Sequence, residues 1–211
     1  MPNWCYNRLI VKSNDDKSSF RRFMDEGRKK EMIEGEQKMV WRISNYFPTP
    51  EKLLQENLSE IDKQELKTMY GFDDWYEWRL FNWGTKWDCD DYGFESSTDE
   101  KSYYILDFDS AWSPPIEFLI NVSIIYPTLS FQLEYIEPGN QFAGTTYINN
   151  GIFLDLCGEP VQKNENGEII DVTYDEENEQ YVLSNGEVFN EDDWYDQDIS
   201  IKKNPFEDFY Y

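Results

Sequence analysis

The sequence predicts an α+β protein whose core is a ferredoxin-like β-α-β-β-α-β antiparallel sheet. Two observations carry this prediction. First, segments rich in β-branched and aromatic residues are interleaved with segments that have helical apolar spacing, in the order strand 4–12, helix 15–26, strand 91–97, strand 103–109, helix 115–126 and strand 129–136. Second, a block of helical character at about 30–88 separates the first helix from the second strand, so we expect a helical insertion there.

The two core helices are predicted by their caps and their apolar stripes. Ser13 or Asn14 can cap the first helix, and Ser113 can cap the second. The residues expected to face the sheet are Phe20, Phe23 and Met24 in the first helix, and Phe118, Leu119, Val122 and Ile125 in the second. Because both helices cross between strands of one sheet, we expect them to cover the same face.

Within the insertion, polar residues 28–38 predict a loop. Pro50 marks the start of a helix, and Asp62 followed by Glu65 predicts a second cap within it. A further short helix is expected after Asp73 or Asp74, with Gly84 at its end.

This last helix belongs to residues 75–88, which contain four of the eight tryptophans. One interpretation is an aromatic plug that seals one end of the core, because large rings contribute the most buried area per residue. The other is a ligand pocket in which Lys86 supplies the charge. Such a pocket would be lined by Trp78, Trp83, Lys86, Trp87 and Trp112.

Beyond residue 150 the pattern becomes all-β and acidic. Short strand-like segments separated by Asn-Gly pairs predict a meander. We therefore expect a ferredoxin-like domain at 1–150 and an acidic β-rich C-terminal extension at 151–211.

Charge is the dominant global feature. The chain has 43 acidic and 19 basic residues, a net charge of −24. Residues 171–211 alone hold thirteen acidic and two basic residues, a net −11. Such a surface repels nucleic acid and anionic membranes and attracts basic proteins. The charge either serves solubility or forms a binding surface, and we expect neither a direct nucleic-acid partner nor a membrane partner.

Several classes of chemistry are disfavoured. The chain has no histidine, which removes the commonest general base and transition-metal ligand. Three widely spaced cysteines argue against a disulfide framework or a Cys-based zinc site. The acidic cluster Asp88, Asp90 and Asp91 is expected to be a solvated face, with a cation site as the alternative. We therefore expect a non-enzymatic protein without cofactor or metal. The absence of a leader and of a long apolar run predicts a cytoplasmic location in the host cell.

Four motifs carry a family resemblance: MPNWCYN at the start, NWGTKWD at 82–88, FDSAWSPP at 108–115 and YIEPGNQFAG at 135–144. Together they resemble the YubB-like proteins of phages and conjugative plasmids, over residues 1 to about 150. The resemblance implies a ferredoxin-like domain and a mobile-element setting. It implies no catalytic residues.

These observations predict an acidic inhibitor or decoy, a DNA mimic that engages a basic DNA-handling or defence protein of the host. The expected partner-binding residues are the acids and aromatics of the tail: Glu191, Asp192, Asp193, Trp194, Tyr195, Asp196, Asp198 and Phe206. The alternative is a small-ligand protein, such as one that binds a nucleotide signal in the aromatic pocket.

Overall fold

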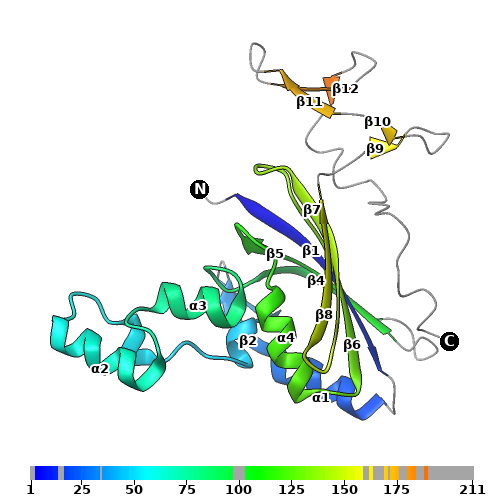
Figure 1. The fold of residues 1–211 in the computed structure, drawn as a ribbon. Helices are drawn as coiled ribbons and strands as arrows, with labels where there is room; N and C mark the ends of the chain where they lie inside the picture. The colour runs from blue at the N-terminus through cyan, green and yellow to red at the C-terminus, as the bar shows by residue number, and fades with distance from the viewer. Residues whose placement is uncertain are drawn as a thin grey trace.

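The computed structural model describes residues 3–13, 17–33, 35–96 and 103–158, together with five short strands between residues 162 and 189. A six-stranded antiparallel sheet, in the order β4-β5-β1-β6-β7-β8, forms its centre (Figure 1). The strands of this sheet are β1 (Trp4–Ser13), β4 (Asp90–Ser96), β5 (Tyr103–Ala111), β6 (Leu129–Glu137), β7 (Phe142–Asn149) and β8 (Ile152–Gly158). The expectation of an α+β protein with antiparallel sheets is confirmed.

Strand β1 lies inside the sheet and pairs with β5 on one side and β6 on the other. Its buried residues alternate along the strand and point toward the helices; they are Cys5, Asn7, Leu9 and Val11. The period of two places one face of the strand in the core, as its sequence predicts.

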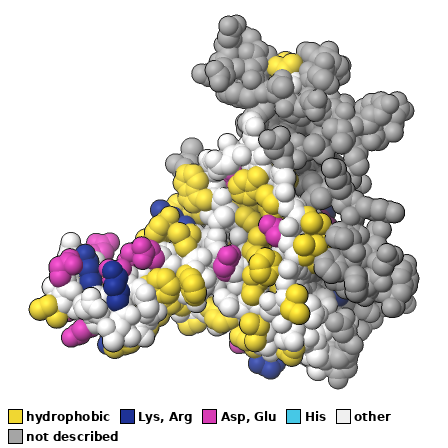
Figure 2. Space-filling model, in the orientation of Figure 1, with side chains coloured by type: hydrophobic (Ala, Val, Ile, Leu, Met, Phe, Trp, Pro, Cys, Tyr) yellow, Lys and Arg dark blue, Asp and Glu magenta, His cyan; other side chains and the backbone are white. Residues whose placement is uncertain are grey.

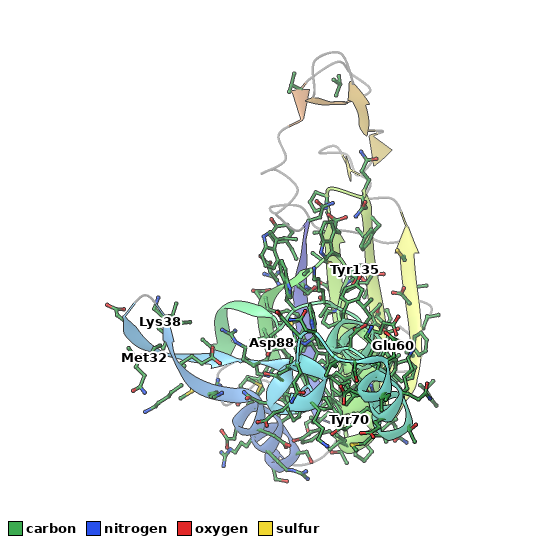
Figure 3. All side chains as sticks on the ribbon, turned by 90° about the vertical axis from the view of Figure 1, so that its left-hand side faces the viewer. Met32, Lys38, Glu60, Tyr70, Asp88 and Tyr135 are labelled. Atoms are coloured by element: carbon green, nitrogen blue, oxygen red, sulfur yellow. The ribbon has the colours of Figure 1, made fainter. Side chains whose placement is uncertain are left out.

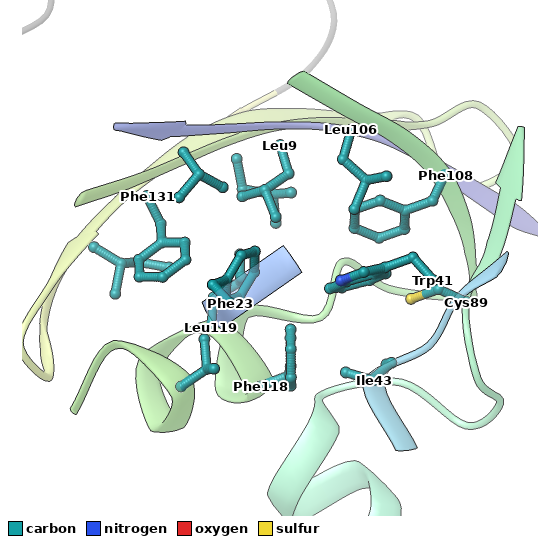
Figure 4. Packing of buried hydrophobic residues seen from close by; sticks show 14 of the residues in the cluster. Leu9, Phe23, Trp41, Ile43, Cys89, Leu106, Phe108, Phe118, Leu119 and Phe131 are labelled. Atoms are coloured by element: carbon teal, nitrogen blue, oxygen red, sulfur yellow. The ribbon is translucent and has the colours of Figure 1, made fainter. Parts of the chain in front are cut away.

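Helices α1 (Lys17–Gly27) and α4 (Ile116–Ile125) cover one face of this sheet (Figure 1). Figure 4 shows Phe23 from α1 and Phe118 and Leu119 from α4 facing the sheet residues. The expected stripes are buried except for Ile125, which is 43% exposed. Ile125 is the last residue of α4.

The insertion begins with a hairpin instead of the expected loop. Strands β2 (Arg28–Ile33) and β3 (Glu36–Trp41) pair antiparallel along their whole length. Figure 3 shows Met32 and Lys38 toward the end of this hairpin, which projects away from the sheet. The segment is polar because most of its side chains are exposed, and for that reason it lacks the apolar alternation that marks a strand.

The helix expected after Pro50 also begins at a different residue. Pro50 precedes only a 3-10 turn, η2 (Glu51–Leu54), and the helix α2 (Glu60–Tyr70) begins after it. Ser59 is the N-cap of α2 and forms a capping box with Asp62. Asp62 is therefore the third residue of the helix and not the cap that the sequence predicts. A second 3-10 turn, η1 (Ile43–Asn45), follows the hairpin.

The main sheet continues beyond residue 150, because β8 pairs with β7 from Asn149↔Ile152 to Ala143↔Gly158. Gly144 on β7 faces the ring of Tyr135, which is buried on β6. Farther along the chain, the described pairings are β9 (Gln162–Lys163) with β10 (Ile169–Ile170), and β12 (Gln180–Leu183) with both β11 (Val172–Asp175) and β13 (Val188–Phe189).

Candidate functional site

The tryptophan-rich segment folds as helix α3 (Trp75–Trp83) and the loop that follows it. Asp74 caps the helix, and its side chain accepts hydrogen bonds from the backbone N–H groups of Tyr76 and Glu77. Gly84 ends it in the left-handed conformation, with φ of 78°. Both ends of α3 therefore agree with the sequence-based expectation.

Trp83 points inward and is a core residue, only 1% exposed. Its indole N–H donates to the carbonyl oxygen of Phe47 at 2.9 Å. The ring of the half-buried Trp78 meets it edge-on, with 6.0 Å between the centroids. For these two residues the geometry agrees with an aromatic plug.

Two cations lie among the rings of this segment. The guanidinium of Arg79 lies 4.9 Å from the centroid of Trp75 and 4.7 Å from that of Trp83. Partial burial lowers the pKa of Arg79, and the nearby Asp88 carboxylate opposes that shift. The ammonium of Lys86 lies 5.1 Å from the centroid of Trp87. At such distances each cation is attracted by the ring faces.

The other members of the predicted pocket lie on the loop after α3 (Lys86 and Trp87) and directly after the end of β5 (Trp112). Thr85 joins the two segments, because its hydroxyl donates to the carbonyl oxygen of Ala111 and accepts from the N–H of Ala111. Trp87 and Trp112 are both exposed, and the ring centroids of Trp87 and Trp4 lie 6.2 Å apart. The predicted pocket residues thus separate into an inward pair, Trp78 and Trp83, and an outward group, Lys86, Trp87 and Trp112.

Asp88 is only half-buried, but it is held by hydrogen bonds to the backbone, so it does not lie on a fully solvated face as expected. Its Oδ1 accepts hydrogen bonds from the N–H groups of Ile43 and Cys89, at 2.9 and 3.0 Å. Burial raises the pKa of Asp88, although these bonds act in the opposite direction. Asp88 therefore joins the insertion to the start of the second core strand. Of its neighbours Asp90 and Asp91, the structure describes the backbone only.

Another acidic group lies at the N-terminus of α3. Asp73, Asp74 and Glu77 each have a carboxylate oxygen within 4.8 Å of the others. Asp73 forms a salt bridge with Lys67 at 2.9 Å, and Asp74 is the helix cap. Two of the three carboxylates thus already have structural roles.

An open groove between α3 and α4 was not predicted from the sequence. Its volume is about 650 Å³, and it is lined by Phe72, Glu77, Leu80, Phe81, Glu117, Ile120 and Asn121. The two sides of the groove are separated by more than thirty residues of sequence, so no local pattern could bring them together. The signal that the sequence offered was Phe81, a large apolar residue on α3 that the structure leaves exposed.

The acidic and aromatic tail residues at 191–206 lie outside the described residues. In the part of the chain that the structure describes, no helix has the length and apolar character needed to cross a membrane.

The fold defines an α+β protein with a ferredoxin-like sheet, and the family match agrees with that class. Residues 82–198 match the family described as "Ferredoxin-like domain in Api92-like protein", and the chain belongs to this family. The prediction of a ferredoxin-like domain is thereby confirmed. A search of solved structures matches the crystal structure of a protein api92 from Yersinia pseudotuberculosis, with 13% identity and a TM-score of 0.45, over 75% of this chain and 98% of that one. No curated protein matches significantly.

Proposed function

We propose that this chain is a non-enzymatic, phage- or plasmid-encoded acidic protein that binds a basic DNA-handling or defence protein of the host in place of DNA. The observation that carries the proposal is the net charge of −24, of which residues 171–211 contribute −11. The resemblance of the N-terminal, tryptophan and FDSAWSPP motifs to YubB-like proteins supports the mobile-element setting.

The mechanism follows from electrostatics. A concentrated negative surface raises the rate of encounter with a basic groove and gives an affinity that falls with salt. An interface made only of charged groups keeps its water. We therefore assign the apolar anchors to the aromatic residues Trp194, Tyr195 and Phe206. No proton transfer or bond cleavage is required, which fits a chain without histidine.

The test has two stages. The purified chain is first used to capture proteins from host lysate at low salt, and the captured proteins are eluted with high salt and identified. A captured DNA-binding protein is then purified, and its binding to duplex DNA is measured while the chain is added as a competitor. Displacement of the DNA supports the proposal; a captured protein that binds DNA equally well in the presence of the chain contradicts it.

Matched variants locate the surface. Replacing Asp192, Asp193, Asp196 and Asp198 with Asn is expected to weaken competition about tenfold at low salt and much less at high salt. The control removes four exposed acids elsewhere: Asp25, Glu51, Glu56 and Glu65. Equal losses from both sets would indicate a general field effect and would reject the tail as the binding surface.

The alternative function is binding of a small anionic ligand at the outward group of aromatics. It is favoured by the ammonium of Lys86, which lies 5.7 Å from the ring centroid of Tyr76 as well as close to Trp87. The acidic field of the chain opposes it. A small molecule that copurifies with the chain and is lost from a Lys86→Met variant would support this alternative.

A further inference from the structure

We infer that the groove between α3 and α4 is a docking site for a basic amphipathic helix of a protein partner. This inference rests on the proposed function only in requiring a basic partner, and its location is argued from the described residues alone.

The floor and walls of the groove are formed by direct contacts between side chains of the two helices and the segment before α3. The side chain of Asn121 on α4 donates to the carbonyl oxygen of Asn82 on α3 at 3.2 Å. Phe72 and Phe81 lie with their ring centroids 5.3 Å apart. The groove is therefore formed before any partner binds, and little reorganisation opposes docking.

The apolar side chains along the groove are exposed to an unusual degree. Phe81 is 67% exposed, and Leu80 is also exposed. On α4, Ile120 lines the groove and is half-buried, and Ile124, one turn farther along the helix, is exposed. Figure 2 shows hydrophobic side chains gathered over α3 and α4 with separate acidic side chains among them. Contiguous apolar patches of this kind mark interaction sites, and an aromatic residue at the centre is a typical anchor.

The charge of the groove selects the partner. Glu77 and Glu117 lie on its lining, one from each helix. Within the described ranges neither carboxylate forms a salt bridge. Glu117 also packs against Gly84, since a Cβ at that glycine would lie 2.6 Å from its Oε2 atom. Two acids that form no salt bridge, beside an apolar floor, complement an apolar stripe flanked by Lys or Arg.

The walls of the groove determine that the occupant is a helix. Both walls are helices, whose backbone N–H and C=O groups are largely paired within the helix, so there is no open sheet edge to which a strand could add. Affinity must come from side chains, and an amphipathic helix presents apolar residues at i, i+3, i+4 and i+7. A second copy of this chain would present the same acidic lining, and repulsion between two highly acidic chains opposes it.

The probe is a fluorescent synthetic peptide of about 18 residues with a leucine stripe at helical spacing and Lys or Arg elsewhere. A scrambled peptide keeps its composition and charge but loses the stripe, and a third peptide replaces each Lys or Arg with Glu. Fluorescence anisotropy with the full chain is measured at about 50 mM and about 500 mM salt. We expect the striped basic peptide to bind at least tenfold more tightly than either control at low salt.

Two variants and two matched controls assign the site. Phe81→Ser is expected to weaken binding of the striped peptide about 10- to 30-fold at both salt concentrations. Its control is Ile61→Ser on α2, because Ile61 is 74% exposed and lies outside the groove. The double variant Glu77→Gln, Glu117→Gln is expected to weaken binding of the striped peptide about fivefold, and only at low salt. Its control is the double variant Glu51→Gln, Glu56→Gln, which removes the same charge outside the groove. Far-UV circular dichroism and the urea midpoint confirm that every variant is folded.

Equal binding of the striped and scrambled peptides would overturn the inference, as would equal losses from Phe81→Ser and Ile61→Ser. Failure here is distinguishable from failure of the proposed function. One outcome would reject the groove and leave the proposed function intact. In that outcome the tail variants no longer displace DNA from the captured protein, whereas Phe81→Ser changes neither the binding of the striped peptide nor the displacement of DNA.

Discussion

Replacing Trp83 with Ala tests whether the aromatic segment serves as a plug. Trp83 is nearly fully buried and belongs to the main core cluster. Truncation of a large buried aromatic residue costs about 3–5 kcal/mol. The lost hydrogen bond to Phe47 adds about 1 kcal/mol, so we expect a total loss of about 4–6 kcal/mol.

That loss is comparable with the whole stability of many domains, about 5–15 kcal/mol. For a chain of this length it corresponds to a fall of roughly 10–20 °C in the melting temperature. The assay is urea unfolding followed by far-UV circular dichroism, because removal of a tryptophan also alters the intrinsic fluorescence. The slope of the transition should stay unchanged if both proteins unfold from the same native structure.

Two further variants calibrate the result. Trp83→Phe keeps an aromatic ring in the core but loses the N–H donor, so it should cost about 1–2 kcal/mol. Trp87→Ala removes a ring that is 37% exposed and should cost less than about 1.5 kcal/mol. If Trp83→Ala unfolds at the same urea concentration as the unmodified chain, the core assignment of Trp83 is wrong.

Three other substitutions test particular contacts. Gly144→Ala should destabilise the chain by more than about 2 kcal/mol, measured by urea unfolding, because the new Cβ would meet the Tyr135 hydroxyl and lie 2.9 Å from a backbone oxygen of β8. Ser59→Ala should cost about 1 kcal/mol by the same assay, through loss of the capping box with Asp62. Burial raises the folded-state pKa of Asp88, so the stability it contributes is fully present below the unfolded pKa of about 3.9 and is lost as pH rises through the folded pKa. Asp88→Asn keeps the Oδ1 acceptor and removes this dependence, so its stability relative to the unmodified chain should rise from about pH 3 to pH 7; a constant difference would contradict the assignment.

The elements that the sequence predicted are those whose burial is periodic. Strand β6 alternates apolar and polar residues from Phe131 to Tyr135, and helix α1 has a narrow apolar stripe, so in both the sequence indicates which face is buried. The caps of α3 were also predictable, because Asp74 and Gly84 act through local backbone chemistry. Such signals need only a few neighbouring residues.

The elements that were missed depend on contacts between distant parts of the chain. The β2–β3 hairpin is polar on most of its surface, and only strand pairing reveals it. The position of Asp88 depends on a hydrogen bond from the backbone of Ile43, which lies 45 residues away. The groove likewise requires α3 to meet α4. In each case the signal lies in the packing of separate segments, which local periodicity does not contain.

The position of β1 has a consequence for synthesis of the chain. This strand is synthesised before both of its partners, β5 and β6, which follow roughly 100 residues later. At a translation rate of about 5–20 residues per second, roughly 5–20 seconds pass between synthesis of β1 and synthesis of its neighbouring strands. During that interval both of its edges and the apolar side chains of Leu9 and Val11 are available to other polypeptides. The nascent chain is therefore most exposed to chaperones, proteases and misassembly before residue 137 has left the ribosome.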